Sequence, residues 1–573
     1  MAETLLSPGV LARENDQSFI TQGPITAGAA IIGPAVKGPV GIPTLVTSYS
    51  DYLSRFGSTF ISGGSVYSYF TSLAAYNYFN NGGETLLVTR VVTGSFTPAT
   101  SNILGANGGV SFQLETLNTG ILQNNSGSEV GGGLLASGSA DNVRWEIVGA
   151  NSGSGAFTLL VRQGNDTTQN KSVLETWTNL SLDPLAPNYI ESVIGNQAFD
   201  VQTDPATGAV YVETTGTYTN KSRYVRVKSV SAPTPNYLDN NGNVSVASYT
   251  GSIPQAASGT FSGATGQLFY GQAAFNENIT LGTNIQGIPA TAYTESIALL
   301  GNQDNYQFNV ITTPGLTLDQ GASQTVIAQL VAMCEARGDA MAIIDTNNYG
   351  ANIGTVIANS SVINSSYAAA YWPWLQVQDV NSGKAVWTPA STMIPGVYAY
   401  NDAVSEPWFA PAGINRGGLA TVIQAERKVA QSDRDTLYLN KINPIATFPN
   451  TGVVVYGQKT LQKAASALDR VNVRRLLIAL KGFISQVALN LVFEQNTAVT
   501  RNVFLSQVNP YLSSVQQRQG LYAFKVVMDD TNNTADVIDR NQLVGQIYIQ
   551  PTRTAEYILL DFNILPTGAT FPS

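Results

Sequence analysis

Hydrophobic residues near the start of the chain follow the order strand, helix, strand. Residues 29–32 and 85–92 are short apolar runs, and between them Tyr69, Leu73 and Tyr76 recur at helical spacing. This order predicts an α/β sheet. The same order returns much later in the chain, at residues 308–312, 324–337 and 340–345.

The residues between these two parts have a different pattern. Short alternating strands such as 144–148 and 157–161 are separated by Gly, Ser, Thr and Asn, which is typical of an all-β module. We therefore predict one discontinuous α/β core domain, residues 23–94 and 291–400, with a β-rich insertion at residues 95–290. The insertion carries thirteen acidic and seven basic residues, which suits a solvated module on the outside of an assembly.

Both ends of the chain differ from this core. Residues 1–22 have an early Pro-Gly break and little core-like periodicity, so we expect an arm that lies on another surface. From residue 401 to residue 573 the pattern becomes more helical and more charged, and it predicts a C-terminal domain. Its helix candidates are residues 414–431, 434–441, 472–495 and 504–519. The predicted fold class is α+β and multidomain.

Composition narrows the chemistry that the chain can perform. Only 12% of its 573 residues are charged, and it has one cysteine, Cys334, and no histidine. A disulfide framework, a Cys/His zinc site and a Ser-His-Asp or Cys-His pair are therefore excluded. We expect no enzyme activity and no cofactor, and we predict that Cys334 is a small core residue.

The low charge also bears on the partners of the chain. Such a surface suits a protein that hides much of itself against its own copies, and it equally suits a neutral, polar virion or extracellular β-protein. The longest apolar stretch, residues 476–493, is broken by polar side chains, and the N-terminus lacks a secretory pattern. We therefore expect a soluble protein, made in the cytoplasm, without a membrane span or anchor.

Positive charge is concentrated in one part of the predicted C-terminal domain. Residues 459–501 include seven basic and two acidic residues. A helix capped by Asn472 would place Arg474 and Arg475 in its first turn, where the helix dipole disfavours cations. An intramolecular salt bridge, for instance to Asp469, and a contact with another protein both remain open.

Two other kinds of ligand are not expected. A net charge of −9 and the lack of a recognised binding motif argue against nucleic acid. Asp529, Asp530, Asp536 and Asp539 lack the alternating spacing and the terminal glutamate of a calcium loop, so no metal site is predicted.

A series of short motifs extends from one end of the chain to the other. In the last third these are residues 452–457 (GVVVYG), 471–476 (VNVRRL) and 557–562 (YILLDF). Near the start are residues 6–10 (LSPGV) and 49–57 (YSDYLSRFG). In their order and spacing these motifs resemble the contractile tail sheath proteins of bacteriophages. The resemblance reaches both ends and most of the core, but it does not cover the insertion.

The resemblance implies a structural subunit that polymerises helically around a tail tube. Its contraction would drive the tube through the host cell envelope for genome delivery. The expected partners are further copies of the chain, the tail tube protein, and the baseplate and tail terminator proteins, with no nucleic acid and no direct membrane insertion. The expected location is the tail sheath of the virion, after assembly in the host cytoplasm.

The resemblance also suggests which residues make contacts between proteins. Basic groups of the C-terminal domain are expected to face an acidic tube or a neighbouring subunit; the candidates are Lys459, Lys463, Arg470, Arg474, Arg475 and Lys481. Both terminal segments are expected to complete sheets in neighbouring subunits, so that exchanged strands finish the C-terminal α/β sheath domain. The candidates in these arms are Leu5, Leu6, Val10, Leu11, Tyr557, Ile558, Leu560 and Phe562.

Two alternative functions stay open at this point. The sheath of a bacterial contractile injection particle shares the C-terminal signatures, and the large insertion favours a phage only mildly. A virion fibre or adhesin, supported by the polar β-rich insertion, would form trimers and bind glycans instead.

Overall fold

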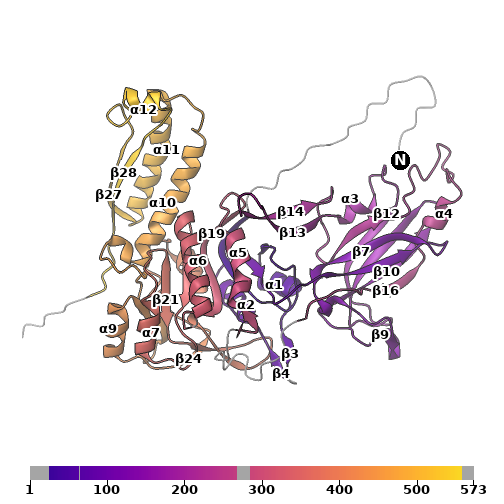
Figure 1. The fold of residues 1–573 in the computed structure, drawn as a ribbon, viewed down its shortest axis with the longest axis horizontal. Helices are drawn as coiled ribbons and strands as arrows, with labels where there is room; N and C mark the ends of the chain where they lie inside the picture. The colour runs from indigo at the N-terminus through magenta and orange to yellow at the C-terminus, as the bar shows by residue number, and fades with distance from the viewer. Residues whose placement is uncertain (1–24, 63–64, 268–283, 320, 558–573) are drawn as a thin grey trace, which may run out of the picture.

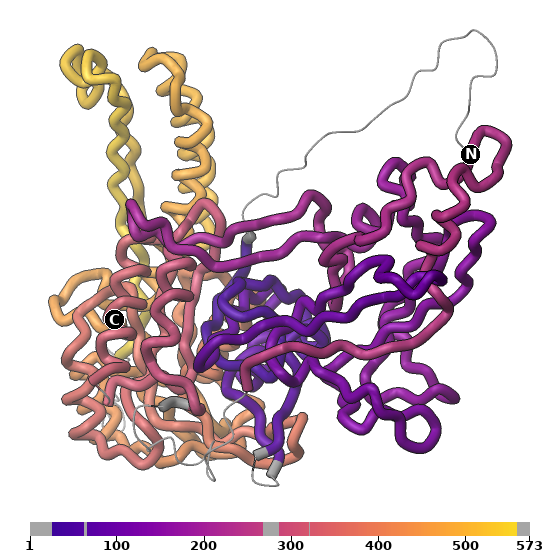
Figure 2. The backbone as a smooth tube through the Cα atoms, turned by 45° about the vertical axis from the view of Figure 1, so that its right-hand side comes forward, coloured from indigo at the N-terminus to yellow at the C-terminus, as the bar shows by residue number. Residues whose placement is uncertain are grey.

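The computed structural model describes residues 25–62, 65–267, 284–319 and 321–557 (Figure 1). These residues form a central sheet with helices packed against it, a β-rich insertion to one side, and a C-terminal lobe that projects from the sheet (Figure 2). The prediction of a mixed α/β protein with several sheets is confirmed.

An eight-stranded sheet forms the centre of the molecule. Its strands stand in the order β2 (Thr44–Val46), β5 (Leu86–Arg90), β1 (Ile25–Gly33), β19 (Tyr306–Thr317), β20 (Met341–Asp345), β21 (Ala368–Trp372), β25 (Ile442–Phe448) and β26 (Gly452–Val455). The six inner strands run parallel, and β2 and β26 pair antiparallel at the two edges. Strands β5, β20 and β21 are buried at every residue, which explains their continuous apolar sequence.

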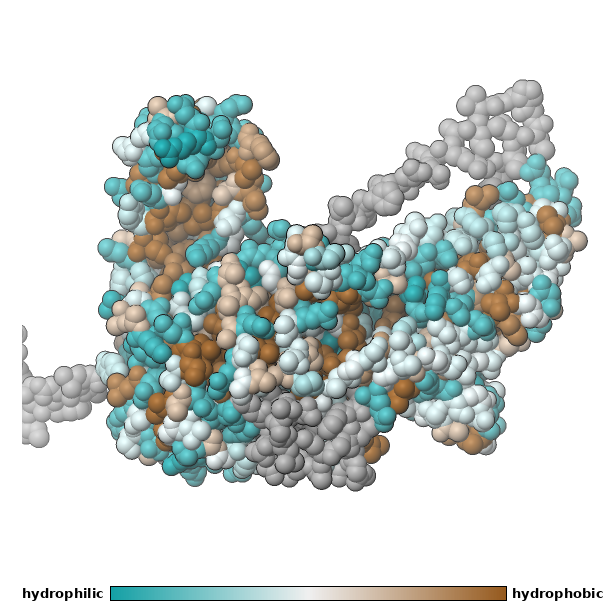
Figure 3. Space-filling view, in the orientation of Figure 1, coloured by the Kyte–Doolittle hydropathy of each residue, from teal (hydrophilic) through white to brown (hydrophobic). Residues whose placement is uncertain are grey.

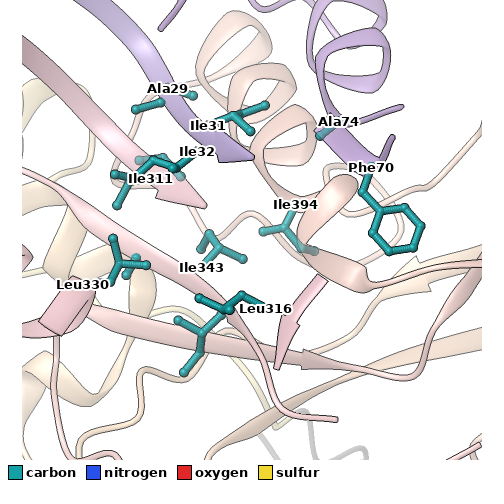
Figure 4. Packing of buried hydrophobic residues seen from close by; sticks show 14 of the residues in the cluster. Ala29, Ile31, Ile32, Phe70, Ala74, Ile311, Leu316, Leu330, Ile343 and Ile394 are labelled. Carbon is teal, nitrogen blue, oxygen red and sulfur yellow. The ribbon is translucent and has the colours of Figure 1, made fainter. Parts of the chain in front are cut away.

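Helices pack against this sheet and join its strands. They are α1 (Tyr49–Phe56), α2 (Phe70–Asn80), α5 (Thr294–Leu299), α6 (Gly321–Arg337), α7 (Ile353–Ser360), α8 (Ile394–Val404) and α9 (Gln431–Leu439). In the core, Ile31, Ile311 and Ile343 of three adjacent strands belong to one cluster with Phe70 of α2 and Ile394 of α8 (Figure 4). Helix α6 carries Cys334 in the same cluster, which confirms that this cysteine is a core residue.

The side chain of Gln286 ties the chain into this core where it returns from the insertion. Its Oε1 accepts a hydrogen bond from the N–H of Phe70 at 2.7 Å, and its Nε2 donates to the carbonyl oxygen of Pro314 at 3.0 Å. Gly315 has a φ of +86°, and a Cβ at this position would lie 2.9 Å from Gln286 Nε2. A glycine is therefore needed there, both for the backbone conformation and for the space that Gln286 fills.

The insertion has two larger sheets and a hydrophobic core of its own. One sheet has the order β12 (Val173–Ser181), β11 (Ala156–Gln163), β10 (Val143–Asn151) and β16 (Ala257–Thr260). The other has the order β15 (Val225–Val230), β7 (Val110–Thr119) and β6 (Pro98–Leu104). Phe112 and Phe157 stack between the two sheets with their ring centroids 5.7 Å apart. Burial alternates along β11, where Phe157, Leu159 and Val161 are buried, and this explains the alternating sequence of that strand.

A two-stranded ribbon connects the insertion back to the central sheet. It consists of β13 (Ala198–Thr203) and β14 (Val210–Thr215), and Val210 and Val212 pack against the central cluster. A salt bridge of 3.4 Å between Arg223 and Asp51 of α1 adds a second contact. The insertion is therefore fixed to the core by more than the two chain crossings.

The C-terminal lobe is built from two long helices and a strand pair. Its elements are α10 (Val471–Leu489), α11 (Ala498–Gln517), β27 (Leu521–Val527), α12 (Ala535–Asp539) and β28 (Gln546–Pro551). Leu476 and Leu480 of α10 share a cluster with Phe504, Val508 and Leu512 of α11. The lobe thus has a core that is separate from the central one.

The remaining elements are short. They are β3 (Phe60–Ser62), β4 (Ser65–Tyr67), β8 (Glu129–Val130), β9 (Leu134–Leu135), α3 (Ile190–Ile194), α4 (Tyr249–Ser252), β17 (Asn284–Ile285), β18 (Ile288–Pro289), β22 (Leu375–Gln378), β23 (Ala385–Thr388) and β24 (Val422–Ala425).

Two expectations about the C-terminal third differ from the structure. The helix expected at residues 414–431 is absent, because Leu419 N–H bonds to the carbonyl oxygen of Val453 and the segment lies along the edge of β26, before β24 joins another sheet. The central sheet also continues to Val455, past the boundary expected at residue 401. The first difference arises because the segment around Leu419 bonds to the edge strand β26, and the second because β25 and β26 themselves add to the central sheet.

The buried carboxyl group of Asp345 gives a first testable prediction. It lies at the end of β20, accepts hydrogen bonds from Ser391 and from Gly315 N–H, and is 3% exposed. Burial raises its pKa from 3.8 to about 6, although the bonds to Ser391 and Gly315 oppose the rise. Between these two pH values the folded chain holds a proton that the unfolded chain has lost, so stability should fall as pH rises from about 4 to 6.

We expect this loss to amount to roughly 3 kcal/mol, since each unit of pKa corresponds to about 1.4 kcal/mol. Asp345→Asn cannot titrate, so the difference between the unfolding free energies of the original chain and the variant should change by that amount between pH 4 and pH 7. Urea unfolding at several pH values measures it, with Asp304→Asn, at an exposed position, as the control for lost charge. A constant difference for Asp345→Asn would contradict the prediction.

Candidate assembly interface

The predicted contact residues lie at the junction between the central sheet and the C-terminal lobe. Helix α10 starts at this junction, and Arg474 and Arg475 are the fourth and fifth of its residues. Arg470, and not Asn472 as expected, occupies the N-cap position, with extended backbone and no capping side chain. Asn472 is buried in the helix, and its Nδ2 donates to the carbonyl oxygen of Trp408 at 3.3 Å. This hydrogen bond from its amide therefore helps to hold the lobe against the core.

Arg475 forms an ion pair inside the chain. Its two terminal nitrogens donate to the two carboxylate oxygens of Asp402, one of them at 2.9 Å, and its guanidinium lies 4.6 Å from the ring centroid of Tyr398. Arg475 is 5% exposed. Burial lowers the pKa of Arg475, but the charge of Asp402 and the bond to it raise it further, so the net shift is upward. The Arg475 side chain therefore joins α10 to α8.

Arg474 is buried without an acidic partner within the described residues. Its guanidinium lies 4.0 Å from the ring centroid of Tyr367, and Nη2 donates to the hydroxyl of Ser366. Burial lowers its pKa, and the nearby Tyr367 and Glu335 only partly offset this. Among the described residues, an intramolecular salt bridge therefore forms at Arg475 but not at Arg474, and the expected partner Asp469 instead pairs with Arg470 and Lys441.

Two further candidates are also held within the chain. Lys459 donates from Nζ to the carbonyl oxygen of Tyr438 at 2.9 Å and lies 4.1 Å from the centre of its ring. Burial lowers the pKa of Lys459, and the neighbouring cations Lys441 and Arg470 add to this. Arg470 makes a two-point contact with Glu556, at 2.6 and 3.0 Å.

The last two candidates, Lys463 and Lys481, are exposed. Lys481 Nζ lies 3.3 Å from the hydroxyl of Tyr367, and Lys463 makes a backbone bond to Asn364. The six basic residues therefore do not form one continuous free patch. Only these two direct their charge toward solvent.

The arm candidates fall mostly outside the described residues. Leu5, Leu6, Val10 and Leu11 lie there at the N-terminus, and Ile558, Leu560 and Phe562 at the C-terminus. Tyr557 is described and is 83% exposed. Just before it, Gln458 Nε2 donates to Thr554 and Glu556, which fixes the course of the chain beside β26.

One exposed surface was not predicted from the sequence. We call it the apolar tip: Leu489, Val492, Phe493, Val499 and Val503, around the turn that joins α10 to α11. Their exposures range from 41% for Val503 to 102% for Phe493. Figure 3 shows hydrophobic surface gathered on the projecting lobe. The apolar stretch at residues 476–493 is visible in the sequence, but such a stretch does not show that the end of the helix extends beyond the core.

Among the described residues, no helix is long and apolar enough to span a membrane, and no three Cys, Asp or Glu residues are grouped as they would be to hold a metal ion.

Two protein families match adjacent parts of the chain, from the central sheet to the C-terminal lobe. Residues 286–461 match the phage tail sheath protein central domain, and residues 463–564 match the phage tail sheath C-terminal domain. The tail sheath protein of Enterobacteria phage T4 is 40% identical over 228 residues, which cover 39% of this chain and 34% of the relative. That of Salmonella phage ViI is 32% identical over 295 residues, covering 48% and 46%. The chain thus spans less than half the length of these curated relatives.

The fold is similar to that of a solved sheath tail protein from Listeria innocua. The two share 10% sequence identity with a TM-score of 0.51, and the match covers 92% of this chain and 95% of that one. This likeness concerns the fold alone. Residues 286–461 and 463–564 are thus similar to two adjacent phage tail sheath domains, and parts of the chain are up to 40% identical to phage tail sheath proteins.

Proposed function

We propose that this protein is the structural subunit of a contractile phage tail sheath. It would polymerise helically around a tail tube and shorten to drive the tube through the host envelope. The observation that carries the proposal is the match of both sheath domains, central and C-terminal, to one continuous part of the chain. The curated relatives are phage proteins, which favours a phage tail over a bacterial injection particle.

Assembly would use the two ends of the chain as exchanged strands. In the described residues β27 and β28 form a sheet of only two strands, which leaves an outer edge on each. Backbone groups at such an edge can accept a strand from another chain. We propose that the arms at residues 1–22 and from Tyr557 onward fill these edges in neighbouring subunits, and so complete the C-terminal domain.

The tube-facing surface would be smaller than the sequence suggests. Lys463 and Lys481 are the basic candidates that remain for a contact with an acidic tube, because Lys459, Arg470, Arg474 and Arg475 have partners within the chain. The apolar tip is a second candidate contact surface, with a tube or with a neighbouring subunit. Baseplate and terminator proteins would bind the ends of the polymer.

Expression of the full chain alone, followed by negative-stain electron microscopy, tests this function. Hollow striated tubes of uniform width are expected. If discrete particles form instead, co-expression with the tail tube protein should yield sheathed tubes. Trimers that remain unchanged by a tube protein would overturn the proposal and favour a fibre.

Replacing Phe493 in the apolar tip should impair assembly without affecting folding. Its side chain is fully exposed, so Phe493→Ser should change the unfolding free energy by less than about 0.5 kcal/mol. If the tip is buried in the assembly, the polymerised fraction should fall at least tenfold, since burying a phenylalanine contributes about 1.5 to 3 kcal/mol per contact. Sedimentation measures the polymerised fraction.

The matched control is Leu185→Ser, at a 70% exposed position of the insertion. It should leave both folding and assembly unchanged. Equal polymerisation of the Phe493 variant and the original chain would exclude the tip as an assembly contact.

A further inference from the structure

A cavity of about 220 Å³ lies where the core domain meets the insertion. Val36 and Arg90 line it from the core side, and Phe96, Ile121, Ser137 and Ser139 from the insertion side. It is partly open to solvent, and none of the candidate assembly contacts lines it. Its walls combine apolar side chains with a buried charge and several hydroxyl and amide groups.

The charge belongs to Arg90, which ends β5 and is 1% exposed. Its guanidinium donates only to carbonyl oxygens: Nε to Ala35 at 3.1 Å, Nη1 to Gly38 at 2.6 Å and to Thr119 at 3.2 Å, and Nη2 to Val36 at 3.4 Å. These four bonds leave one N–H of Nη2 for a further acceptor within the described residues. The ring of Phe96 lies 5.1 Å from the guanidinium carbon.

No carboxylate of the described residues balances this charge. The nearby acid Asp141 pairs with Lys37, with its Oδ1 3.3 Å from Lys37 Nζ. Burial lowers the pKa of Arg90 to about 10, so the side chain is still a cation at neutral pH. A buried cation without a counter-ion costs free energy, and an anion in the adjoining space would offset that cost.

Two hydroxyl groups of the cavity wall can act as donors toward such an anion. Ser139 Oγ accepts bonds from Asp141 N–H and Asn142 N–H, each at 3.2 Å, which directs its own O–H elsewhere. Ser137 Oγ accepts a bond from Ser126 N–H. A carboxylate can accept several hydrogen bonds at once, and bonds from a guanidinium to it are among the stronger ones.

We propose that this cavity binds a small organic monocarboxylate. Its carboxylate would accept bonds from Arg90, Ser137 and Ser139, and its short hydrocarbon part would lie against Val36 and Ile121. One uncompensated cation matches one negative charge, whereas a phosphate dianion would leave an excess. A volume of 220 Å³ equals that of about seven water molecules, which suits an acid of about four to seven heavy atoms.

Isothermal titration of the full chain with sodium butyrate tests the proposal. Butyramide, which has the same shape without the charge, and sodium chloride serve as matched ligands. We expect one butyrate to bind per chain at least tenfold more tightly than butyramide, and a rise in Tm with butyrate that chloride does not reproduce. Absent binding, or equal binding of butyrate and butyramide, would overturn the proposal.

Variants locate the binding at this cavity. Arg90 is not suitable because it also holds the backbone of residues 35–38 in place. Ser137→Ala with Ser139→Ala should weaken butyrate binding at least fivefold, while the exposed Ser154→Ala should leave it unchanged. An unchanged affinity of the double variant would show that the binding lies elsewhere. If that variant does not fold, the comparison of butyrate with butyramide on the original chain decides whether the chain binds a carboxylate.

Discussion

Asp402→Ala should lower the free energy of unfolding by roughly 3 to 5 kcal/mol, because it leaves Arg475 buried as an unpaired cation. Arg475 is 5% exposed, and its ion pair with Asp402 has a bond of 2.9 Å. Within the described residues, the ring of Tyr398 is the only aromatic ring that lies against its guanidinium. An isolated guanidinium in this environment must either stay charged without a partner or pull water into the junction between α8 and α10.

A double replacement of the same pair should have a much smaller effect. Breaking a buried ion pair is costly, whereas replacing both members by apolar residues of similar size is often neutral. Asp402→Leu combined with Arg475→Met should therefore recover most of the stability that Asp402→Ala loses. Urea unfolding measures all three chains.

The matched control is the exposed pair of Asp536 and Arg540, in which both side chains are more than 60% exposed. Asp536→Ala should cost less than about 0.5 kcal/mol, since exposed ion pairs contribute little. If Asp402→Ala costs no more than this control, the pair does not hold the lobe to the core.

The inner strands could be predicted because parallel strands buried on both faces leave continuous apolar runs in the sequence. Residues 85–92 and 340–345 are such runs, and they contain β5 and β20. The need of Arg475 for an acidic partner was also predictable, since the expected start of the helix placed it in the first turn, where a cation is disfavoured. The partner was not, because Asp402 lies 73 residues away and reaches Arg475 only through the packing of α8 against α10.

Other features depend on contacts that no local pattern records. Asn472 looks like a helix cap, but its buried amide bonds to Trp408, and the helix starts one residue earlier. Residues 414–431 have helical spacing, yet the edge of β26 offers backbone partners that the segment takes instead. The cavity at Arg90 joins residues from two domains, so it could not be inferred from either part of the chain alone.

Deleting Met1 to Gln22 should abolish polymerisation and leave a folded monomer. The five buried clusters of the described residues begin at Ala27, and β1 begins at Ile25, so the known cores do not need the deleted segment. We therefore expect the Tm of the dilute chain to change by no more than a few degrees. Gel filtration and negative-stain microscopy report the loss of polymers.

The expected size of this effect follows from the apolar residues of the arm. Leu5, Leu6, Val10 and Leu11 would each contribute about 1.5 to 3 kcal/mol if fully buried in a neighbour, or roughly 6 to 12 kcal/mol per subunit. Each 1.4 kcal/mol is a factor of ten in affinity, so the contact between subunits should weaken at least ten-thousandfold. The backbone bonds of an added strand would be lost as well.

A pair of full-length variants separates the role of apolar burial from that of the backbone. Changing these four residues to serine keeps the length of the arm but removes the apolar groups, and it should prevent assembly nearly as well as the deletion does. Changing them to isoleucine keeps the apolar groups and should preserve assembly. Tubes of normal width from the deletion variant would refute strand exchange by this arm, and the contacts between subunits would then have to come from the apolar tip and the folded domains.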